Sequence, residues 1–251
     1  MTQDVTLPAG YRLVACDALD STNEEAARRA RDGAPDGTVV WARRQTAGRG
    51  RHGRHWESPD GNLYCSILLR PDVTPGQSAQ LTFVAALALG RTLDGILPED
   101  AKLTFKWPND VLLGGRKVAG ILLESSGSRG GHLDWLVVGC GLNVHHFPEH
   151  AAYPATSLRA TGSAMPPVPE LLAAFVEAFA LWRARWQAEG LGPVRDAWLA
   201  RAAQIGGDVS VRLPGNELRG RFAGLDAAGA LLLDLPDGSR RTVNAGDVFF
   251  H

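Results

Sequence analysis

A chain of 251 residues with 45% hydrophobic and 21% charged residues is long enough for one large domain with a sizeable core and a second, small domain. Its formal net charge of −1 argues against a protein that coats nucleic acid through its overall field, so we expect no DNA partner. The sequence has no run of about 18 apolar residues and no basic-then-apolar leader, so we expect no membrane span, no signal peptide and a cytoplasmic protein.

The cysteine and lysine counts restrict the chemistry further. Cys16, Cys65 and Cys140 are odd in number, far apart and without a C-x-x-C pair, so we expect reduced thiols rather than disulfides or a zinc site. Of 26 basic residues only three are lysine, at positions 102, 106 and 117. A lysine retained in such an arginine-rich chain hints at a need for a compact point charge.

The N-terminal part predicts a short strand at residues 12–15 and then a helix. Ser21-Thr22-Asn23-Glu24 has the S-x-x-E form of a capping box, and an Ala- and Arg-rich helix follows that ends near Asp32-Gly33. Two interpretations of residues 21–23 stay open: they cap the helix, or they line a polar corner at its N-terminus that tolerates an anion.

The densest stretch of the chain is a loop that follows a buried-type strand at residues 38–42. Residues 45–56 contain three glycines, three arginines and a closing tryptophan. Glycine lets the backbone approach a ligand, arginine matches phosphate or carboxylate oxygens, and tryptophan offers a flat face to an aromatic base. We therefore interpret this stretch, the Gly/Arg loop, as a binding site for an anion.

Two common nucleotide-binding motifs are excluded in the Gly/Arg loop. Gly48-x-Gly50-x-x-Gly53 has the spacing of the dinucleotide fingerprint, but that fingerprint needs a helix immediately after it. Residues 55–61 are turn-formers instead, and a strand at 63–69 follows them. A P-loop is excluded as well, because no Gly-Lys-Ser/Thr closes the motif.

The middle of the chain predicts one buried helix and then strands joined by hairpins. Residues 78–93 are apolar nearly all round, as expected for a helix packed on a sheet. We expect strands at 102–105, 111–113, 116–124 and 133–143, with a turn at Lys106-Trp107-Pro108-Asn109-Asp110 and a hairpin at Gly114-Gly115.

The strand at 116–124 carries an unusual lysine. Strict alternation puts Lys117 on the face of Ala119 and opposite to Gly120. A lysine on so apolar a strand either needs an anionic partner or protects an edge strand from aggregation, and both interpretations stay open. Gly120 and Gly139 interrupt two strands and would leave room for a flat ligand.

The C-terminal third predicts two helices and a small all-β unit. His145, His146 and His150 lack a carboxylate or thiol at metal-site spacing, so we interpret them as solvated. Residues 169–189 form an amphipathic helix, a short helix spans 194–203, and five short strands follow Gly206-Gly207. We expect a large domain at 1–203 and an SH3-like or OB-like domain at 207–251.

The Gly/Arg loop, residues 106–110 and residues 116–122 resemble, in this order along the chain, the motifs of biotin protein ligases. The resemblance covers nearly the whole chain. Residues 21–23 and Gly139-x-Gly141-Leu142-Asn143 match further motifs of that family, and His52 and His55 stand where basic residues are usual. The resemblance implies an α+β fold, with a mixed, mostly antiparallel sheet and helices as in class II synthetase catalytic domains, plus a small C-terminal SH3-like β-barrel. Because the first strand begins by about residue 11, we expect the form without an N-terminal DNA-binding domain.

The resemblance also implies an activity and partners. Biotin and ATP, carrying Mg²⁺ on its phosphates, would form biotinyl-5′-AMP, and the biotinyl group would pass to a lysine of a biotin carboxyl carrier protein. The oligomeric state is open, with a homodimer among the options.

Family correspondence assigns the site residues. Those expected to bind biotin are Ser21, Thr22, Asn23, Gln45, Gly48, Arg49, Gly50, Arg51, Lys117, Gly120 and Gly139. Those expected to bind ATP are Arg54, Trp56, Asn109 and Asn143. Arg51 and Lys117 are the expected catalytic residues, and no metal ligand is identified in the protein.

Two alternatives remain at this stage. A lipoate or octanoate ligase or transferase shares the fold and also acylates a carrier lysine, but it lacks this Gly/Arg loop. A non-catalytic module could bind RNA through the loop and the C-terminal domain, which the near-zero net charge disfavours.

Overall fold

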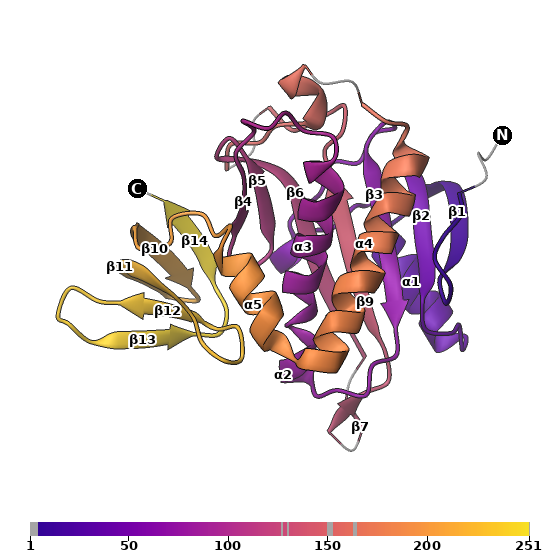
Figure 1. The fold of residues 1–251 in the computed structure, drawn as a ribbon. Helices are drawn as coiled ribbons and strands as arrows, with labels where there is room; N and C mark the ends of the chain where they lie inside the picture. Colours follow the sequence, from indigo (N-terminus) through magenta and orange to yellow (C-terminus); the bar gives the residue numbers. More distant parts are fainter. Residues whose placement is uncertain (1–4, 127, 130, 150–152, 163–164, 251) are drawn as a thin grey trace.

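The computed structural model describes residues 5–126, 128–129, 131–149, 153–162 and 165–250. A seven-stranded sheet with the order β1-β2-β3-β9-β6-β5-β4 forms its centre (Figure 1). The strands are β1 (Arg12–Leu19), β2 (Thr38–Gln45), β3 (Leu63–Leu69), β4 (Leu103–Lys106), β5 (Asp110–Leu113), β6 (Arg116–Ser125) and β9 (Leu136–Leu142). Among the described strands of this sheet, only β1 and β2 pair in parallel, so the predicted α+β class with a mixed, mostly antiparallel sheet is confirmed.

Helices cover the two faces of this sheet unequally. The face turned toward the viewer in Figure 1 carries α3 (Leu81–Asp94), α4 (Val168–Glu189) and α5 (Leu191–Leu199), preceded by the single turn of α2 (Pro75–Ser78). Of the described helices, only α1 (Thr22–Arg31) lies on the opposite face, where it packs on β2, β3 and β9 in the half of the sheet that contains β1. The remaining short elements are η1 (Arg51–Gly53), β7 (Ser128–Arg129), β8 (His132–Leu133) and η2 (Leu158–Thr161).

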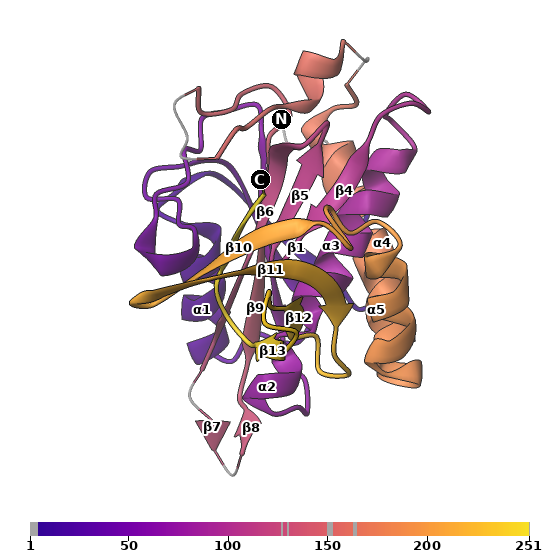
Figure 2. The ribbon, with the colours of Figure 1, turned by 90° about the vertical axis from the view of Figure 1, so that its left-hand side faces the viewer.

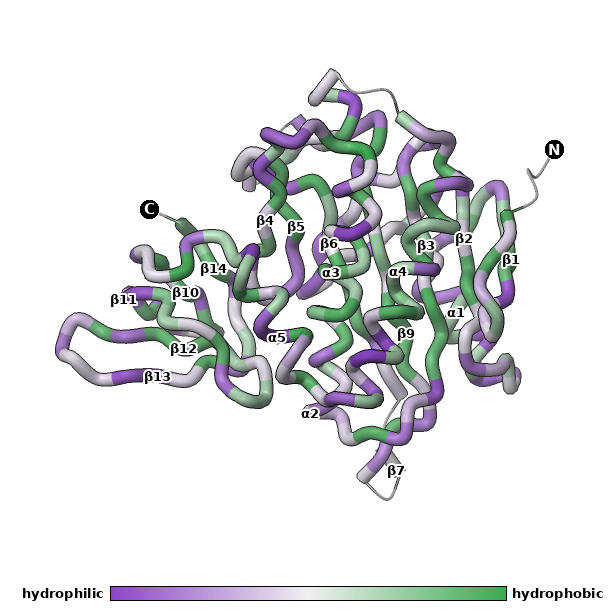
Figure 3. Tube along the Cα trace, viewed as in Figure 1, coloured by the Kyte–Doolittle hydropathy of each residue, from purple (hydrophilic) through white to green (hydrophobic). Residues whose placement is uncertain are grey.

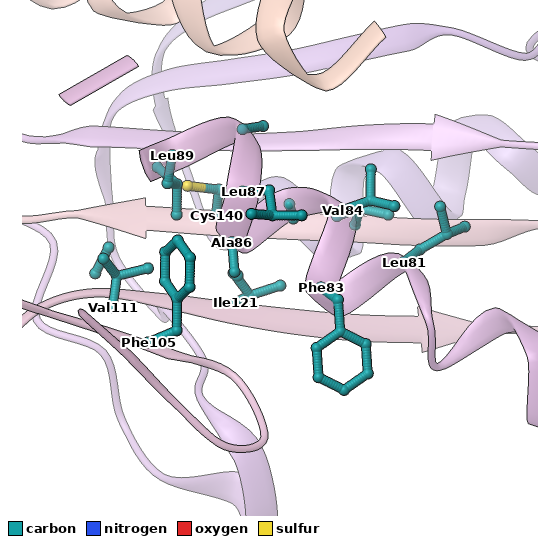
Figure 4. Close-up of a cluster of buried hydrophobic side chains, with 14 of the residues drawn as sticks. Leu81, Phe83, Val84, Ala86, Leu87, Leu89, Phe105, Val111, Ile121 and Cys140 are labelled. Carbon is teal, nitrogen blue, oxygen red and sulfur yellow. The ribbon is translucent and has the colours of Figure 1, made fainter. Parts of the chain in front are cut away.

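The main hydrophobic core lies between α3 and the central strands. Leu81, Val84 and Leu87 of α3 belong to one cluster of buried side chains with Ile121 of β6 and Cys140 of β9, part of which Figure 4 draws. The hydropathy colours of Figure 3 are mainly hydrophobic along α3 and β9. Because hydrophobic side chains fill this face, we look for a polar ligand-binding site on the opposite face, which α1 covers only in part.

A second sheet follows the helices. Its order is β13-β12-β11-β10-β14, it is antiparallel throughout, and it stands at the β4 side of the large sheet in Figures 1 and 2. Its strands are β10 (Asp208–Leu213), β11 (Asn216–Leu225), β12 (Leu231–Asp234), β13 (Arg240–Val243) and β14 (Asp247–Phe250). The expected five-stranded C-terminal unit is confirmed, while the division at residues 203–207 stays a prediction.

The segment that joins the two sheets also pairs with the edge of the large one. The amide of Phe105 in β4 donates to the carbonyl of Arg201 at 2.8 Å, and the amide of Ala203 donates to the carbonyl of Phe105 at 2.7 Å. Trp107 Nε1 donates to the carbonyl of Gly229 in the C-terminal unit at 3.2 Å. The edge strand β4 is therefore covered, and the C-terminal unit is fastened beside it.

The predicted capping box is wrong. Ser21 is the N-cap residue of α1, but its side chain makes no capping hydrogen bond, and Glu24 pairs with Arg49 rather than with the helix start. The free amide of Thr22 is satisfied instead by Oε1 of Gln45 at 2.8 Å. A long-range partner has replaced the local cap, which favours the interpretation of this corner as part of a site.

The predicted orientation of Lys117 is wrong as well. The pairing of β5 with β6 shifts between Val111 and Leu112, because β6 contains a bulge. A bulge adds one residue and reverses the alternation beyond it. Val118 and Ala119 therefore both face the core, and the Lys117 amine lies on the Gly120 face. Since β6 lies between β9 and β5, Lys117 is not an edge-strand lysine.

None of the described helices is long and apolar enough to cross a membrane.

Candidate functional site

The Gly/Arg loop folds back on itself over the α1 side of the sheet. Arg49 and His55 form an isolated antiparallel bridge, the Gly50 amide donates to the Arg54 carbonyl at 2.7 Å, and the Trp56 amide donates to the Gly48 carbonyl at 2.9 Å. Gly48 is required there, because a Cβ atom would overlap the Trp56 carbonyl. A cavity of about 320 Å³ lies between this loop and β6, lined by Arg49, Gly50, Arg51, His52, Gly53, Leu122, Leu123 and Glu124.

A network of uncharged polar groups, all buried except the half-buried Gln45, lies between α1 and strands β2 and β3. Gln45 Oε1 accepts from the Thr22 amide and from Thr22 Oγ1, at 2.8 and 3.1 Å. Ser66 Oγ lies 2.8 Å from Thr22 Oγ1 and 2.6 Å from Asn23 Oδ1, and Gln45 Nε2 donates to Ser58 Oγ at 2.8 Å. The structure thus brings together three expected residues, and we name this set, with Ser58 and Ser66, the neutral network.

Ser58 and Ser66 were missed by sequence reasoning. Ser66 is fully buried in β3, where every other residue from Leu63 to Leu69 is hydrophobic. A single hydroxyl in such a strand was an available signal, because a buried polar group needs a partner. Ser58 follows the loop in a turn-rich segment and gave no comparable signal.

The glycines of β6 and β9 form the floor of the site. Gly120 pairs with Gly141, and Cβ atoms on these glycines would come within 3.1 and 2.7 Å of the Trp56 indole. A Cβ atom on Gly139 would overlap the Asn23 side chain. The interrupted strands therefore leave room, as expected, and in this structure Trp56 and Asn23 occupy it. Trp56 Nε1 is buried without a hydrogen-bond partner among the described residues.

Arg49 is held by two carboxylates of the protein itself. Its guanidinium lies 2.5 Å from Glu24 of α1 and donates to both oxygens of Glu124 on β6 at 2.8 Å. Glu124 also accepts from Asn23 Nδ2 at 2.7 Å. Arg49 thus joins the loop to the neutral network, and its charge is already balanced.

Arg51 and Arg54 reach the C-terminal unit. Arg51 Nη1 lies 3.2 Å from Asp247 Oδ1 and 3.3 Å from Asn109 Oδ1, and Arg54 Nη2 lies 2.5 Å from Asp247 Oδ2. Burial lowers the pKa of Arg51, and the charge of Asp247 opposes that shift. One carboxylate therefore serves two arginines, and sequence reasoning missed it because it lies 196 residues from Arg51.

Lys117 has the anionic partner that its position requires. Its Nζ lies 2.5 Å from Asp110 Oδ1 and 5.3 Å from the centre of the Trp56 ring. Lys106 Nζ lies 3.7 Å from the other oxygen of Asp110. Asp110 was not among the expected site residues, although it ends the motif at residues 106–110.

The two expected ATP-binding asparagines occupy different places. Asn109 Nδ2 donates to the Ile121 carbonyl at 2.7 Å, which leaves Oδ1 facing Arg51. Asn143 is buried and donates from Nδ2 to the Thr156 carbonyl at 3.0 Å, so it fastens the loop beyond β9 and has no hydrogen bond to Arg51 or Lys117.

Among the described residues no three His, Cys, Asp or Glu side chains are grouped to hold a metal ion. The rings of His145 and His146 lie 6.4 Å apart, and His150 lies outside the described residues.

Uncharged hydrogen-bonding groups thus lie beside several cations under the Gly/Arg loop, as in a protein that binds a small ligand carrying an anionic group. Comparison of the sequence with known families shows which family of such proteins this is. The model for the biotin/lipoate A/B protein ligase family matches residues 16–143, and the model for the biotin protein ligase C-terminal domain matches residues 205–251. The chain belongs to this family, and the expected resemblance to biotin protein ligases is confirmed.

Individual relatives cover most of the chain. It is 46% identical to the biotin–[acetyl-CoA-carboxylase] ligase of Paracoccus denitrificans, over 92% of this chain and 97% of that protein. It is 36% identical to the biotin–[acetyl-CoA-carboxylase] ligase of Mycobacterium tuberculosis, over 91% of this chain and 85% of that protein. The structure is similar to biotin protein ligase from Aquifex aeolicus in complex with biotin and ATP, with a TM-score of 0.80, 29% identity and coverage of 95% and 97%.

Proposed function

We propose that this protein is an ATP-dependent biotin–[acetyl-CoA-carboxylase] ligase. In the first half-reaction an oxygen of the biotin carboxylate attacks the α-phosphorus of ATP, the bond to the β-phosphate oxygen breaks, and biotinyl-5′-AMP and pyrophosphate form. In the second, a lysine amine of a biotin carboxyl carrier protein attacks the anhydride carbonyl, and AMP leaves. The names of the relatives from Paracoccus and Mycobacterium, and the biotin and ATP bound in the Aquifex protein, support this activity.

One observation carries the proposal: two chemically different half-sites meet under one loop. The neutral network offers hydrogen-bonding groups without net charge, which suits the ureido ring of biotin. Arg51, Arg54 and Lys117, which we name the cation cluster, offer guanidinium and ammonium groups that suit a carboxylate and a triphosphate that repel each other. The Gly/Arg loop spans both, so it can press the two anions together.

Arg51 and Lys117 are the proposed catalytic residues. Asp247 and Asn109 orient Arg51, and Asp110 orients Lys117, so both cations are positioned before substrate arrives. Preorganised cations stabilise the charge that develops at the α-phosphorus, and each such contact contributes about 2 to 4 kcal/mol in the transition state.

The remaining expected residues bind and enclose the substrates in this proposal. Ser21, Thr22, Asn23 and Gln45 hold the biotin head, joined by Ser66, while the backbone of Gly48 and Gly50 and the side chain of Arg49 shape the loop over it. Trp56 is half-buried and offers its indole to adenine, and Arg54 and Asn109 face the phosphates. Closure of the loop keeps water from the reactive anhydride.

A magnesium ion on the ATP phosphates belongs to the proposal, where it would neutralise phosphate charge. Asn109 Oδ1 and the Gly246 carbonyl are uncharged oxygens that face Arg51, whereas both oxygens of Asp110 already face lysines. The protein therefore fits a metal held chiefly by phosphate oxygens.

ATP–pyrophosphate exchange tests the proposal. We expect exchange that depends on biotin and is absent with lipoate or octanoate in its place. The family model covers both biotin and lipoate ligases, so exchange with lipoate alone would replace the proposed substrate, and absence of exchange with every acid would remove the proposed activity.

Three further points stay predictions. A cytoplasmic location fits the three free cysteines of the chain, the carrier protein is the expected macromolecular partner, and a homodimer remains an option. Size-exclusion chromatography with light scattering measures the last of these.

A further inference from the structure

Lys106 is a buried cation that the proposed mechanism does not use. Its side chain is only 8% exposed at the end of β4, and the nearest carboxylate oxygen among the described residues, on Asp110, is 3.7 Å from Nζ. The amine lies 3.7 Å from the centre of the Tyr153 ring, and the rings of Phe249 and Phe250 are 5.8 Å away. Burial lowers the pKa of Lys106, so its surroundings do not fully compensate its charge.

The cations around Lys106 outnumber the carboxylates. Arg51, Arg54, Lys106 and Lys117 share Asp110 and Asp247, which leaves four positive and two negative charges in this part of the described structure. Arg51, Arg54 and Lys117 each have a carboxylate oxygen within 3.2 Å, whereas Lys106 does not. The surplus is therefore concentrated at Lys106, and a buried surplus charge is costly unless an anion arrives to balance it.

We propose that Lys106 binds the β- and γ-phosphates of ATP, which leave as pyrophosphate, while Arg51 and Lys117 act at the carboxylate and the α-phosphate. The inference rests on the proposed function and divides the cations of that site between two tasks. When the bond between the α-phosphorus and the bridging oxygen breaks, its electron pair goes to the pyrophosphate, and the ammonium of Lys106 balances that charge without any proton transfer.

The geometry supports this division of tasks. Lys106 and Lys117 lie against opposite oxygens of the same carboxylate, Asp110, so one extended polyanion can contact both amines. Lys106 is on the side of the C-terminal unit, next to Phe249 and Phe250, whereas Lys117 is on the side of Trp56 and the glycine floor. A compact ammonium also fits between aromatic rings where a planar guanidinium would need more space.

The substitution Lys106→Met removes the charge and keeps the length of the side chain. We expect dissociation constants for pyrophosphate and ATP, measured by calorimetry, to rise about tenfold to a hundredfold, as for loss of a charged contact. Affinity for AMP, and transfer of biotin from added biotinyl-5′-AMP to a carrier domain, should stay within about twofold, because neither involves the β- and γ-phosphates. The exposed Lys102, changed to Met, is the matched control and should alter none of these values.

A second measurement needs no variant and serves if Lys106→Met does not fold. Amine acylation of the native protein, followed by mass spectrometry, should show Lys106 protected by pyrophosphate and Lys102 not protected. Unchanged pyrophosphate affinity in Lys106→Met, equal losses for pyrophosphate and AMP, or no protection of Lys106 would each overturn the inference. If the native protein shows no biotin-dependent exchange but Lys106 is still protected by pyrophosphate, the proposed function fails and the phosphate site stands.

Discussion

The two halves of the site differ in how complete they are without ligand. In the neutral network the side-chain donors of Thr22, Gln45 and Ser66 each have an acceptor on another segment. The carboxylates of Glu24 and Glu124 balance the charge of Arg49. Among the described residues of the cation cluster and Lys106, four positive side chains share two carboxylates, and the carboxylate oxygen nearest to Lys106 is 3.7 Å away. The first half therefore has its hydrogen bonds made without a ligand, whereas the second keeps a surplus of positive charge that an anion would balance.

The largest effect should come from Arg51, which belongs to the incomplete half. Arg51→Met should lower biotin-dependent ATP–pyrophosphate exchange by about a hundredfold to a thousandfold, because a preorganised cation is lost in the transition state. Steady-state exchange rates measure this, with the thermal midpoint as a check on folding. The matched variant is Arg49→Met, whose smaller loss would reflect that this arginine is already neutralised; equal losses in the two variants would contradict the division into halves.

Gly139→Ala should disrupt the neutral network. The added methyl group would overlap Asn23, so this side chain must leave Ser66 and Glu124. We expect a loss of about 2 kcal/mol in the free energy of unfolding, as for other overpacked sites, and a clear rise in KM for biotin. Urea unfolding and exchange kinetics measure the two quantities. Gly76→Ala, which adds a methyl group into open space, is the control, and an unchanged biotin KM in Gly139→Ala would argue against Asn23 as a biotin ligand.

Ser66→Ala is a milder test of the same half. Removing one buried hydroxyl should cost about 1 to 2 kcal/mol and raise the dissociation constant of biotin about tenfold, since two partners lose a hydrogen-bonding group. Binding of ATP should not change, which calorimetry with each ligand can establish. Ser210→Ala removes an equally buried hydroxyl in β10 and should affect stability at most, so weaker biotin binding there would point to a general effect of stability.

The smallest effect should come from a charge pair outside the site. Hydrogen bonds from Arg28 lower the pKa of Asp20 from 3.8 to about 2, so the unfolded chain binds its proton at higher pH than the folded chain. The stabilisation is therefore complete above about pH 4 and is lost as the pH falls toward 2. Asp20→Asn should reduce stability at pH 7 by less than about 1 kcal/mol, because both side chains are more than 40% exposed.

Urea titrations of the native protein and Asp20→Asn at pH 7 and pH 2 measure this difference. It should shrink at the lower pH, and a large difference at pH 7 would show that exposed charges contribute as much as those of the site.

The sequence predicted the parts of the site that are carried by local patterns. The Gly/Arg loop, the turn at residues 106–110 and the glycine-interrupted strands all lie where they were expected, and the α+β class followed from the family resemblance. What was missed depends on contacts between distant segments. Asp247 lies 193 and 196 residues from the arginines that it pairs with, and Gln45 replaces a local cap of α1 from 23 residues away.

The face of Lys117 shows a different limit of sequence reasoning. Alternation assigns faces correctly only while two strands stay in register, and the bulge at Val118 is set by pairing with β5 rather than by its own residue type. Whether an apolar strand contains a bulge depends on its neighbours, so the predicted face was reversed while the predicted need for an anionic partner was correct.

The pairing of Phe105 with Arg201 and Ala203 has a practical consequence for work on isolated fragments. A fragment that stops at residue 201 would remove one of the two backbone hydrogen bonds and uncover the outer edge of β4, the strand that carries Lys106. An uncovered edge strand invites association between copies, so such a fragment would lose activity through self-association even if the C-terminal sheet never touched a substrate. A fragment that ends after Ala203 keeps this protective pairing and is the better starting point for asking what the second sheet contributes.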